Sequence, residues 1–147
     1  MTIRKMTAAD ICAAAEIEKV CFSVPWTEGM LRSEIDDSSC VYRGIFDGEA
    51  LVGYAGMRTV LDEGYINNVA VLPAYRRQGL ARALLTELEK DAAALRLSFM
   101  TLEVRESNLP ARTLYASLGY VPVGLRPRYY ERPAEDAVLM TKYFTER

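Results

Sequence analysis

Two side chains in the second half of the chain have the chemistry for proton transfer. Glu103 is a carboxylate on the polar face of a segment, 98–104, whose alternate residues are apolar. Such a carboxylate can act as a general base, directly or through water, or can form an ion pair with Arg105 or a neighbouring arginine. Tyr115 follows in a short helical pattern, where its ring could pack in the core or its phenol could protonate a leaving group.

The pKa values of free groups favour one kind of substrate for Glu103. A free glutamate has a pKa of about 4.3, whereas that of an α-amine is about 7.7–8.0 and that of a lysine side chain is about 10.4. The smaller gap makes an α-amine the easier group for a glutamate to deprotonate. Desolvation can raise the pKa of a glutamate, so a lysine acceptor stays open.

A glycine at the start of a helix, with arginines just before it, predicts an anion site. The stretch 75–85 reads YRRQGLARALL. N–H groups at a helix N-terminus lack partners within the helix and attract anions, and glycine lets an anion approach the backbone closely. A solvated basic turn is the alternative. We expect a pyrophosphate to be held by the backbone amides of Arg77, Gln78, Gly79, Leu80, Ala81 and Arg82.

Asparagines mark two further positions. Asn67 and Asn68 interrupt an otherwise apolar segment. Paired asparagines disfavour regular strand pairing and indicate a β-bulge, although they could simply lie on the surface. Asn108 stands just before a helical pattern and could cap that helix.

The composition excludes several kinds of catalytic site. The chain contains no histidine, which rules out Ser-His and Cys-His nucleophile systems and argues against zinc. Its three cysteines, Cys12, Cys21 and Cys40, lack metal-ligand spacing and are interpreted as small buried hydrophobes. None lies in 65–130 with the other candidates, so a cysteine nucleophile is not expected. We therefore expect no metal, and acid–base chemistry by the remaining titratable groups or water.

The whole chain has the profile of one soluble globular domain. Its 147 residues favour a single domain over 1–147, and it is 50% hydrophobic and 26% charged. No apolar run is long enough to span a membrane, and residues 1–6 lack an apolar signal core, so we expect a cytoplasmic protein without a membrane partner. The net charge of -2 argues against duplex nucleic acid as a direct partner.

Helical spacing and capping residues predict four helices. The first follows a capping box, the second is capped by Thr27, the third covers about 79–95, and the fourth lies between Pro110 and Gly119. The residues expected to face the core are Ile11, Ala14, Ile17 and Cys21; Met30, Leu31 and Ile35; Leu84, Leu85, Leu88, Ala92 and Leu95; and Leu114 and Leu118.

Seven further segments are predicted to be strands, with a tight hairpin at Asp47-Gly48. The order β-α-α-β-β-β-α-β-α-β-β indicates an α/β (α+β) fold, with a mixed, mostly antiparallel central sheet flanked by helices. Residues 125–136 are left as a loop between the last two strands. The expected strands are 2–6, 40–46, 50–58, 65–72, 98–104, 120–124 and 137–144.

With these motifs the chain resembles the GNAT superfamily of acetyl-CoA-dependent N-acetyltransferases. Arg76-x-x-Gly79-x-Ala81, between a predicted strand and helix, matches the pyrophosphate motif of that superfamily. The chain is most similar to the RimI-type enzymes, which acetylate the N-terminal alanine of a small-subunit ribosomal protein. The segments that carry this likeness are CFSVPWTEGML (21–31), LEVRESNLPARTLYASLGY (102–120), RPRYY (126–130) and EDAVLM (135–140).

The resemblance implies a GNAT fold, acetyl-CoA as cosubstrate and a role for each candidate. Glu103 would be the proton acceptor and Tyr115 the general acid. The asparagine that matches Asn108 contacts coenzyme A in the superfamily. A bulge on the matching strand frees backbone groups to face the thioester and pantetheine, which here are those of Val69, Ala70 and Val71.

The resemblance also predicts where the acceptor binds. Tyr129 and Tyr130 could pack in a hairpin or grip the acceptor's N-terminal backbone, with Pro25 and Trp26 as the opposite wall. The predicted reaction is direct acetyl transfer, in a ternary complex, to the N-terminal alanine of a small-subunit ribosomal protein. Other protein N-termini, lysine side chains or a small amine are alternative acceptors. A non-catalytic coenzyme A-binding module is the alternative from a different class.

Overall fold

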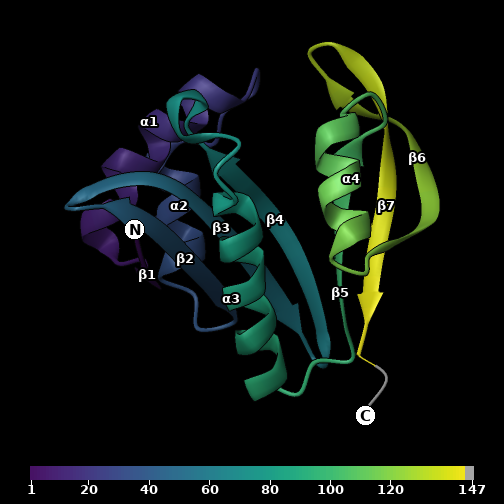
Figure 1. Cartoon of the computed structure of the whole chain (residues 1–147), viewed down its shortest axis with the longest axis horizontal. Coiled ribbons are helices and arrows are strands. Elements are labelled where there is room, and N and C mark those ends of the chain that lie inside the picture. The colour runs from purple at the N-terminus through teal and green to yellow at the C-terminus, as the bar shows by residue number, and fades with distance from the viewer. Residues whose placement is uncertain (145–147) are drawn as a thin grey trace.

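The computed structural model describes residues 1–144 as one mixed sheet with helices on both faces (Figure 1). The strand order is β1-β2-β3-β4-β5-β7-β6, and every neighbouring pair is antiparallel except β4 and β5, which are parallel. The predicted order of elements and the mixed, mostly antiparallel sheet are confirmed. The strands are β1 (Thr2–Lys5), β2 (Cys40–Asp47), β3 (Ala50–Val60), β4 (Glu63–Val71), β5 (Phe99–Arg105), β6 (Val121–Glu131) and β7 (Ala134–Tyr143).

Four α-helices cover the two faces of the sheet. The first two pack on one face, and the third and fourth pack on the other (Figure 1). Within residues 1–144 no helix is both long and apolar enough to cross a membrane. The helices are α1 (Ile11–Cys21), α2 (Glu28–Ile35), α3 (Leu80–Ala94) and α4 (Leu109–Ser117), with 3-10 turns η1 (Ala8–Asp10) and η2 (Pro73–Tyr75) before α1 and α3.

The core consists of one apolar cluster on each face. Leu84 and Leu88 of α3 are fully buried in the larger cluster, and Ile11 and Leu31 anchor the smaller cluster under α1 and α2. Removing this apolar surface from water is the main force that holds the helices on the sheet. The apolar periodicity predicted these contacts correctly.

Three burial predictions are wrong. Met30 is 45% exposed, because its neighbour Leu31 takes the inward position in the first turn of α2. Leu95 is 52% exposed, because it is the C-cap of α3 and the chain turns away at Arg96, which has a φ of 57°. Cys12 is exposed on α1 rather than buried.

Local sequence signals set the ends of several elements, as predicted. The Thr27 hydroxyl accepts a hydrogen bond from the Met30 backbone N–H at 3.2 Å and caps α2. Thr7 forms a capping box at η1, just before α1. Gly48 has a φ of 61° in the tight β2–β3 turn, and Gly119 has a φ of 99° after α4. These two left-handed conformations favour glycine because it has no Cβ.

The last hairpin differs from the prediction. β6 runs over Val121–Glu131 rather than 120–124, and β7 begins at Ala134 rather than 137. Tyr129 and Tyr130 therefore lie in a strand and not in a loop. Pairing reaches the Glu131–Ala134 pair, but the register shifts between Arg126 and Tyr130. This irregularity, on an edge strand exposed on both faces, removes the apolar alternation that would have revealed the strand.

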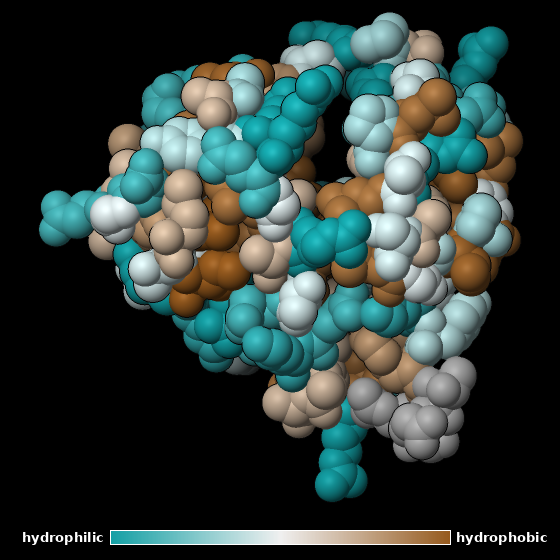
Figure 2. Space-filling view, in the orientation of Figure 1, coloured by the Kyte–Doolittle hydropathy of each residue, from teal (hydrophilic) through white to brown (hydrophobic). Residues whose placement is uncertain are grey.

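The sheet opens between its two parallel strands. β4 and β5 pair only from Glu63–Phe99 to Tyr65–Thr101, and beyond that point they part (Figure 1). β4 also contains a bulge, since Met57 pairs with Ile66 and Gly56 with Asn68, which leaves Asn67 as the extra residue. The predicted bulge is confirmed. Figure 2 shows an opening in the surface between the part formed by α3 and the part formed by α4.

Candidate active site

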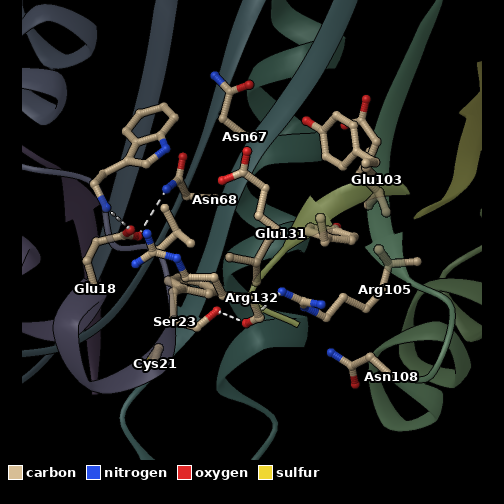
Figure 3. A pocket seen from close by; sticks show the side chains of 18 of the residues that line it. Glu18, Cys21, Ser23, Asn67, Asn68, Glu103, Arg105, Asn108, Glu131 and Arg132 are labelled. Carbon is tan, nitrogen blue, oxygen red and sulfur yellow. Dashed lines mark hydrogen bonds between the residues drawn. The ribbon is translucent and has the colours of Figure 1, made fainter. Parts of the chain in front are cut away.

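A pocket of about 720 Å³ lies where β4 and β5 part. Its walls come from the α1–α2 loop, the bulge of β4, the end of β5, the start of α4 and the turn between β6 and β7 (Figure 3). Among the residues proposed from the sequence, those that line it are Trp26, Val69, Glu103, Asn108, Tyr115, Tyr129 and Tyr130.

The parting of the strands lets side chains from both faces of the sheet reach this pocket. Along β5, Leu102 and Val104 are buried on the face covered by α3 and α4, where Tyr115 joins the same cluster. Glu103 points to the opposite face, as strand alternation requires. Both Glu103 and Tyr115 nevertheless line the one pocket, because no strand fills the gap beside β5. A base and an acid on opposite sides of a bound thioester could act on its two ends.

Glu103 has one charged partner within the described residues. Its Oε1 atom lies 3.3 Å from Nε of Arg126, and the two side chains are 26% and 54% exposed. Arg105, the partner considered from the sequence, instead pairs with Glu135 at 3.2 Å. An ion pair this exposed contributes little to stability, so it does not by itself explain a carboxylate at the pocket wall.

Tyr115 is buried, and its hydroxyl has no hydrogen-bond partner among residues 1–144. Its ring packs edge-on against Tyr120, with ring centroids 6.0 Å apart. Burial raises the pKa of Tyr115 to about 12, so the phenol carries its proton at neutral pH. It can therefore donate a proton, or a hydrogen bond, to a group that becomes anionic in the pocket.

Tyr129 and Tyr130 form an aromatic wall at the other side. Their rings meet edge to face with centroids 5.1 Å apart, and the Arg105 guanidinium lies 4.4 Å from the centre of the Tyr130 ring. Burial, followed by the nearby Glu103 charge, raises the pKa of Tyr129. Burial likewise raises the pKa of Tyr130. Both phenols are thus neutral hydrogen-bond donors beside Glu103.

The two asparagines of the β4 bulge are fixed by carboxylates from the helices behind them. Nδ2 of Asn67 donates to Oε1 of Glu34 at 2.9 Å, and Nδ2 of Asn68 donates to Oε2 of Glu18 at 3.0 Å. Asn68 is only 5% exposed, so the surface interpretation is wrong for this residue. The backbone beyond the bulge continues through Val69, which lines the pocket.

The predicted anion site lies at the N-terminus of α3, outside the walls of this pocket. α3 begins at Leu80, and Gly79 precedes it with a φ of 76° and no side-chain cap. The first N–H groups of the helix are therefore available to an anion. Arg76 is not free to bind it in this arrangement, because its Nε donates to the Val71 carbonyl at 3.0 Å. Arg82 donates to the Ser117 hydroxyl at 2.7 Å.

The remaining predicted residues fall into two groups. Asn108 caps α4, accepting a hydrogen bond from the Ala111 N–H at 3.2 Å, and it also faces the pocket. Pro25 adjoins the pocket residue Trp26 but is not itself among the lining residues. Outside the lining set are also Ala70, Val71, Arg77, Gln78, Gly79, Leu80, Ala81 and Arg82.

Sequence reasoning missed several residues that shape the pocket. Glu18 is 1% exposed and lies at its inner wall, and the Ser23 hydroxyl donates to the Arg132 carbonyl across it (Figure 3). That bond joins the α1–α2 loop to the β6–β7 turn. A signal for Glu18 did exist: it falls four residues after Ala14, on the buried face of α1. No local pattern could reveal the Ser23 contact, which spans more than a hundred residues.

No metal centre is formed by residues 1–144, where no group of three or more His, Cys, Asp or Glu side chains could hold an ion. The site instead combines a carboxylate and a protonated phenol in the pocket with a helix N-terminus that no side chain caps, near the gap between parallel strands. These are the parts that transfer of an acyl group from a phosphorylated carrier needs. The fold and the pocket thus define an acyltransferase.

Comparison with known proteins gives the family. Residues 11–120 match the model of the acetyltransferase (GNAT) family. The [ribosomal protein bS18]-alanine N-acetyltransferase of Escherichia coli K12 is 36% identical over 141 residues, 95% of each chain. The enzyme of the same name from Haemophilus ducreyi is 34% identical over 146 residues, 96% of this chain and 99% of its own. The crystal structure of the ribosomal-protein-S18-alanine N-acetyltransferase from Escherichia coli has a TM-score of 0.92 at 33% identity, covering 99% of this chain and 95% of that one.

The chain therefore belongs to the GNAT acetyltransferase family. This confirms the predicted fold, the predicted class of enzyme, an N-acetyltransferase, and acetyl-CoA as its cosubstrate.

Proposed function

We propose that this enzyme transfers the acetyl group of acetyl-CoA to the α-amine of the N-terminal alanine of ribosomal protein bS18. The observation that carries the chemistry is the convergence of Glu103 and Tyr115 on one pocket, where β4 and β5 part. The acceptor rests on the two relatives named for that reaction, each of which aligns over at least 95% of this chain.

The donor would bind along the gap between β4 and β5. Its pyrophosphate would lie on the N–H groups of residues 77–82, with Asn108 contacting another part of coenzyme A. The positive end of the α3 dipole favours an anion there. From that end the pantetheine would follow the backbone of residues 69–71 toward the pocket, which brings the thioester between Glu103 and Tyr115.

The reaction proceeds in a ternary complex of enzyme, acetyl-CoA and acceptor. Glu103 takes a proton from the acceptor ammonium, directly or through water, and the free amine attacks the thioester carbon. The carbon–sulfur bond then breaks, and Tyr115 gives its phenolic proton to the leaving thiolate. The second proton of the attacking nitrogen passes through water to the Tyr115 phenolate, which leaves a neutral amide, the coenzyme A thiol and a restored phenol. Burial supports this role, because a phenol with a pKa of about 12 still holds its proton when the thiolate forms.

The acceptor's first residues would lie between two walls. Trp26 lines one side of the pocket and Tyr129 and Tyr130 line the other, with Pro25 beside Trp26. The neutral phenols can donate hydrogen bonds to backbone carbonyls of the peptide. An α-amine also suits a glutamate base better than a lysine does, because its proton is about two pKa units more acidic. We place this reaction in the cytoplasm and regard residues 1–147 as a single catalytic domain.

A peptide panel tests the acceptor directly. Purified enzyme and acetyl-CoA are incubated with a peptide carrying the bS18 N-terminus, the same peptide with a blocked α-amine and an internal lysine, and a polyamine. Mass spectrometry should find one acetyl group on the terminal alanine and none on the other two. Equal rates on the polyamine would contradict the substrate assignment. Release of no coenzyme A with any amine would favour the binding-module alternative.

Mass spectrometry of ribosomal protein N-termini, from cells with and without the gene, tests the assignment in vivo. Loss of the acetyl group from bS18 alone is the expected result. Loss of the acetyl group from other proteins but not from bS18 would support the proposed reaction but contradict the proposed acceptor.

A further inference from the structure

The carboxylate of Glu18 on α1 bonds to three other segments, the α1–α2 loop, β4 and β3, at the inner wall of the pocket. Its Oε1 accepts a hydrogen bond from the Trp26 backbone N–H at 2.8 Å, and its Oε2 accepts from Nδ2 of Asn68 at 3.0 Å (Figure 3). Oε2 also accepts from the Tyr54 hydroxyl. Glu18 comes from α1, Trp26 from the α1–α2 loop, and Asn68 from the strand that parts from β5. No other carboxylate described in residues 1–144 bonds to both the loop and β4.

These contacts are strong enough to hold their partners in place. Glu18 is 1% exposed, and hydrogen bonds to a buried carboxylate are short and about twice as strong as neutral ones. Burial, and then the Glu18 charge, raises the pKa of Tyr54, so its hydroxyl remains a donor to that carboxylate. The three donors together satisfy both oxygens, and losing one would leave a buried polar group unpaired.

Glu34 on α2 provides a natural comparison. It also holds a bulge residue, accepting from Nδ2 of Asn67 at 2.9 Å and from the Tyr42 hydroxyl at 3.1 Å, and it pairs with Arg58. Yet it has no hydrogen bond or ion pair with the α1–α2 loop among the described residues. Glu18 and Glu34 therefore each accept a hydrogen bond from one of the two adjacent asparagines of the bulge. Only Glu18 also accepts one from the loop that carries Trp26.

We propose that Glu18 is a positioning residue that fixes the acceptor-binding loop relative to the strand that presents the thioester. One carboxylate sets the distance between the Trp26 backbone and the Asn68 side chain, and so the width of the pocket between acceptor and donor. The effect on the reaction rests on the proposed function, whereas the effect on the loop does not. A displacement of about 1 Å at a reacting centre can cost about 10²-fold in rate.

Replacement by glutamine should break this link. Glutamine has one acceptor oxygen and one amide nitrogen that only donates, so either the Trp26 N–H or the Asn68–Tyr54 pair must face a donor. Glu18→Gln should therefore release the loop and raise the acceptor KM, with kcat falling by up to about 10²-fold. The KM for acetyl-CoA should change less than that for the acceptor, because the proposed pyrophosphate contacts lie at the α3 N-terminus and not at Glu18. Glu34→Gln, the matched control, should leave the acceptor KM at the wild-type value.

Trp26 reports on the loop without any substrate, since it is the only tryptophan in the chain. Acrylamide should quench its fluorescence more strongly in Glu18→Gln than in wild-type protein or Glu34→Gln, compared at temperatures where each is folded. If Glu18→Gln does not fold, Glu18→Asp takes its place, because the shorter side chain keeps the charge but cannot reach both partners. Wild-type quenching and acceptor KM in whichever variant folds would overturn the proposal. Increased quenching in the Glu18 variant, together with a wild-type enzyme that acetylates another acceptor, would overturn only the proposed substrate.

Discussion

At the scale of single residues, the proposed chemistry depends on two side chains that reach one pocket from opposite faces of the sheet. Glu103 lies at the exposed face beside Arg126, and Tyr115 lies in the core with an unpaired hydroxyl. The two environments suit opposite tasks. A carboxylate near solvent can pass a proton on, whereas a buried phenol with a raised pKa stays protonated at neutral pH and can donate to an anionic group beside it.

Glu103→Gln should lower kcat by about 10²–10⁴-fold, the usual contribution of a general base. Acetyl-CoA affinity should change little, because Glu103 lies on the sheet face opposite α3. Steady-state kinetics and calorimetric titration of acetyl-CoA measure the two effects. Glu106→Gln, at an exposed position outside the pocket, is the control and should retain wild-type turnover. Unimpaired turnover of Glu103→Gln would remove this residue from the mechanism.

Tyr115→Phe should lower kcat by about 10²–10⁴-fold while leaving the free energy of unfolding close to that of wild type. The reason is that the hydroxyl has no partner in residues 1–144, so its removal breaks no contact there. Tyr120→Phe is the matched control, since the Tyr120 hydroxyl contacts Glu89 at 3.4 Å and Tyr120 lies outside the pocket. It should lose some stability in urea unfolding and keep its kcat. If Tyr115→Phe instead lost stability and kept its kcat, Tyr115 would have only a structural role in the core.

At the scale of elements, the start of α3 shows how a sequence motif can have two physical causes. Gly79 was predicted as the place where a phosphate approaches the backbone. The structure adds that Gly79 has a φ of 76°, a conformation that costs other residues about 1–2 kcal/mol. A Cβ built there meets nothing within 4 Å, so backbone conformation rather than crowding within the chain requires the glycine.

Gly79→Ala should therefore destabilise the protein by about 1 kcal/mol and also raise the KM for acetyl-CoA. The second effect follows if the backbone relaxes and moves the first N–H groups of α3. Gly48→Ala is the control, because Gly48 has a similar φ of 61°, equally open surroundings and a place in the β2–β3 turn rather than at the N-terminus of α3. It should lose similar stability in urea unfolding with no change in KM. If Gly79→Ala and Gly48→Ala had the same KM for acetyl-CoA, this would argue against pyrophosphate binding at α3.

The capping box before α1 predicts a pH dependence of stability. Burial of Asp10 alone would raise its pKa, but hydrogen bonds from Arg4 and the Thr7 N–H outweigh burial and lower it. A carboxyl with a lowered pKa in the folded state stabilises above its unfolded pKa of about 3.9, and this stability is lost as the pH falls through the folded value.

Asp10→Asn should consequently be less stable than wild type at neutral pH, with the difference shrinking as the solution is acidified. Urea unfolding over a pH series measures this. A difference between the two proteins that stays constant with pH would show that the charge of Asp10 is not what stabilises the start of α1.

The elements also show what the sequence could and could not predict. Caps, the Asp47-Gly48 turn and the buried face of α3 are local, and they were predicted correctly. β6 was cut short because the apolar alternation of Val121, Val123 and Leu125 ends there, and the irregular, exposed stretch that follows has no such pattern. The contacts of Glu18 depend on which elements meet in space, and local patterns do not encode that. The same applies to the place where β4 and β5 part.

At the scale of the whole molecule, the sheet consists of two parts joined by a short seam. Strands β1 to β4 form one part, β5 to β7 form the other, and only three β4–β5 residue pairs connect them. The pocket lies beyond this seam, so a ligand that bridges the gap contacts both parts. Among residues 1–144, the Ser23–Arg132 hydrogen bond is a further link across the same opening.

Acetyl-CoA contacts both parts of the sheet in the proposed arrangement, so its binding should raise the Tm of the whole protein. At a concentration about 100 times its Kd, a ligand that binds only the folded state adds about 2.7 kcal/mol, a rise of several degrees in Tm for a chain of this size. Acetylated pantetheine, which lacks the pyrophosphate, should give a smaller shift at equal concentration because it does not reach the N-terminus of α3. Differential scanning calorimetry would measure both shifts. Equal shifts from the two ligands would place the binding energy in the pocket rather than at α3, and no shift from saturating acetyl-CoA would mean that the gap is not its binding site.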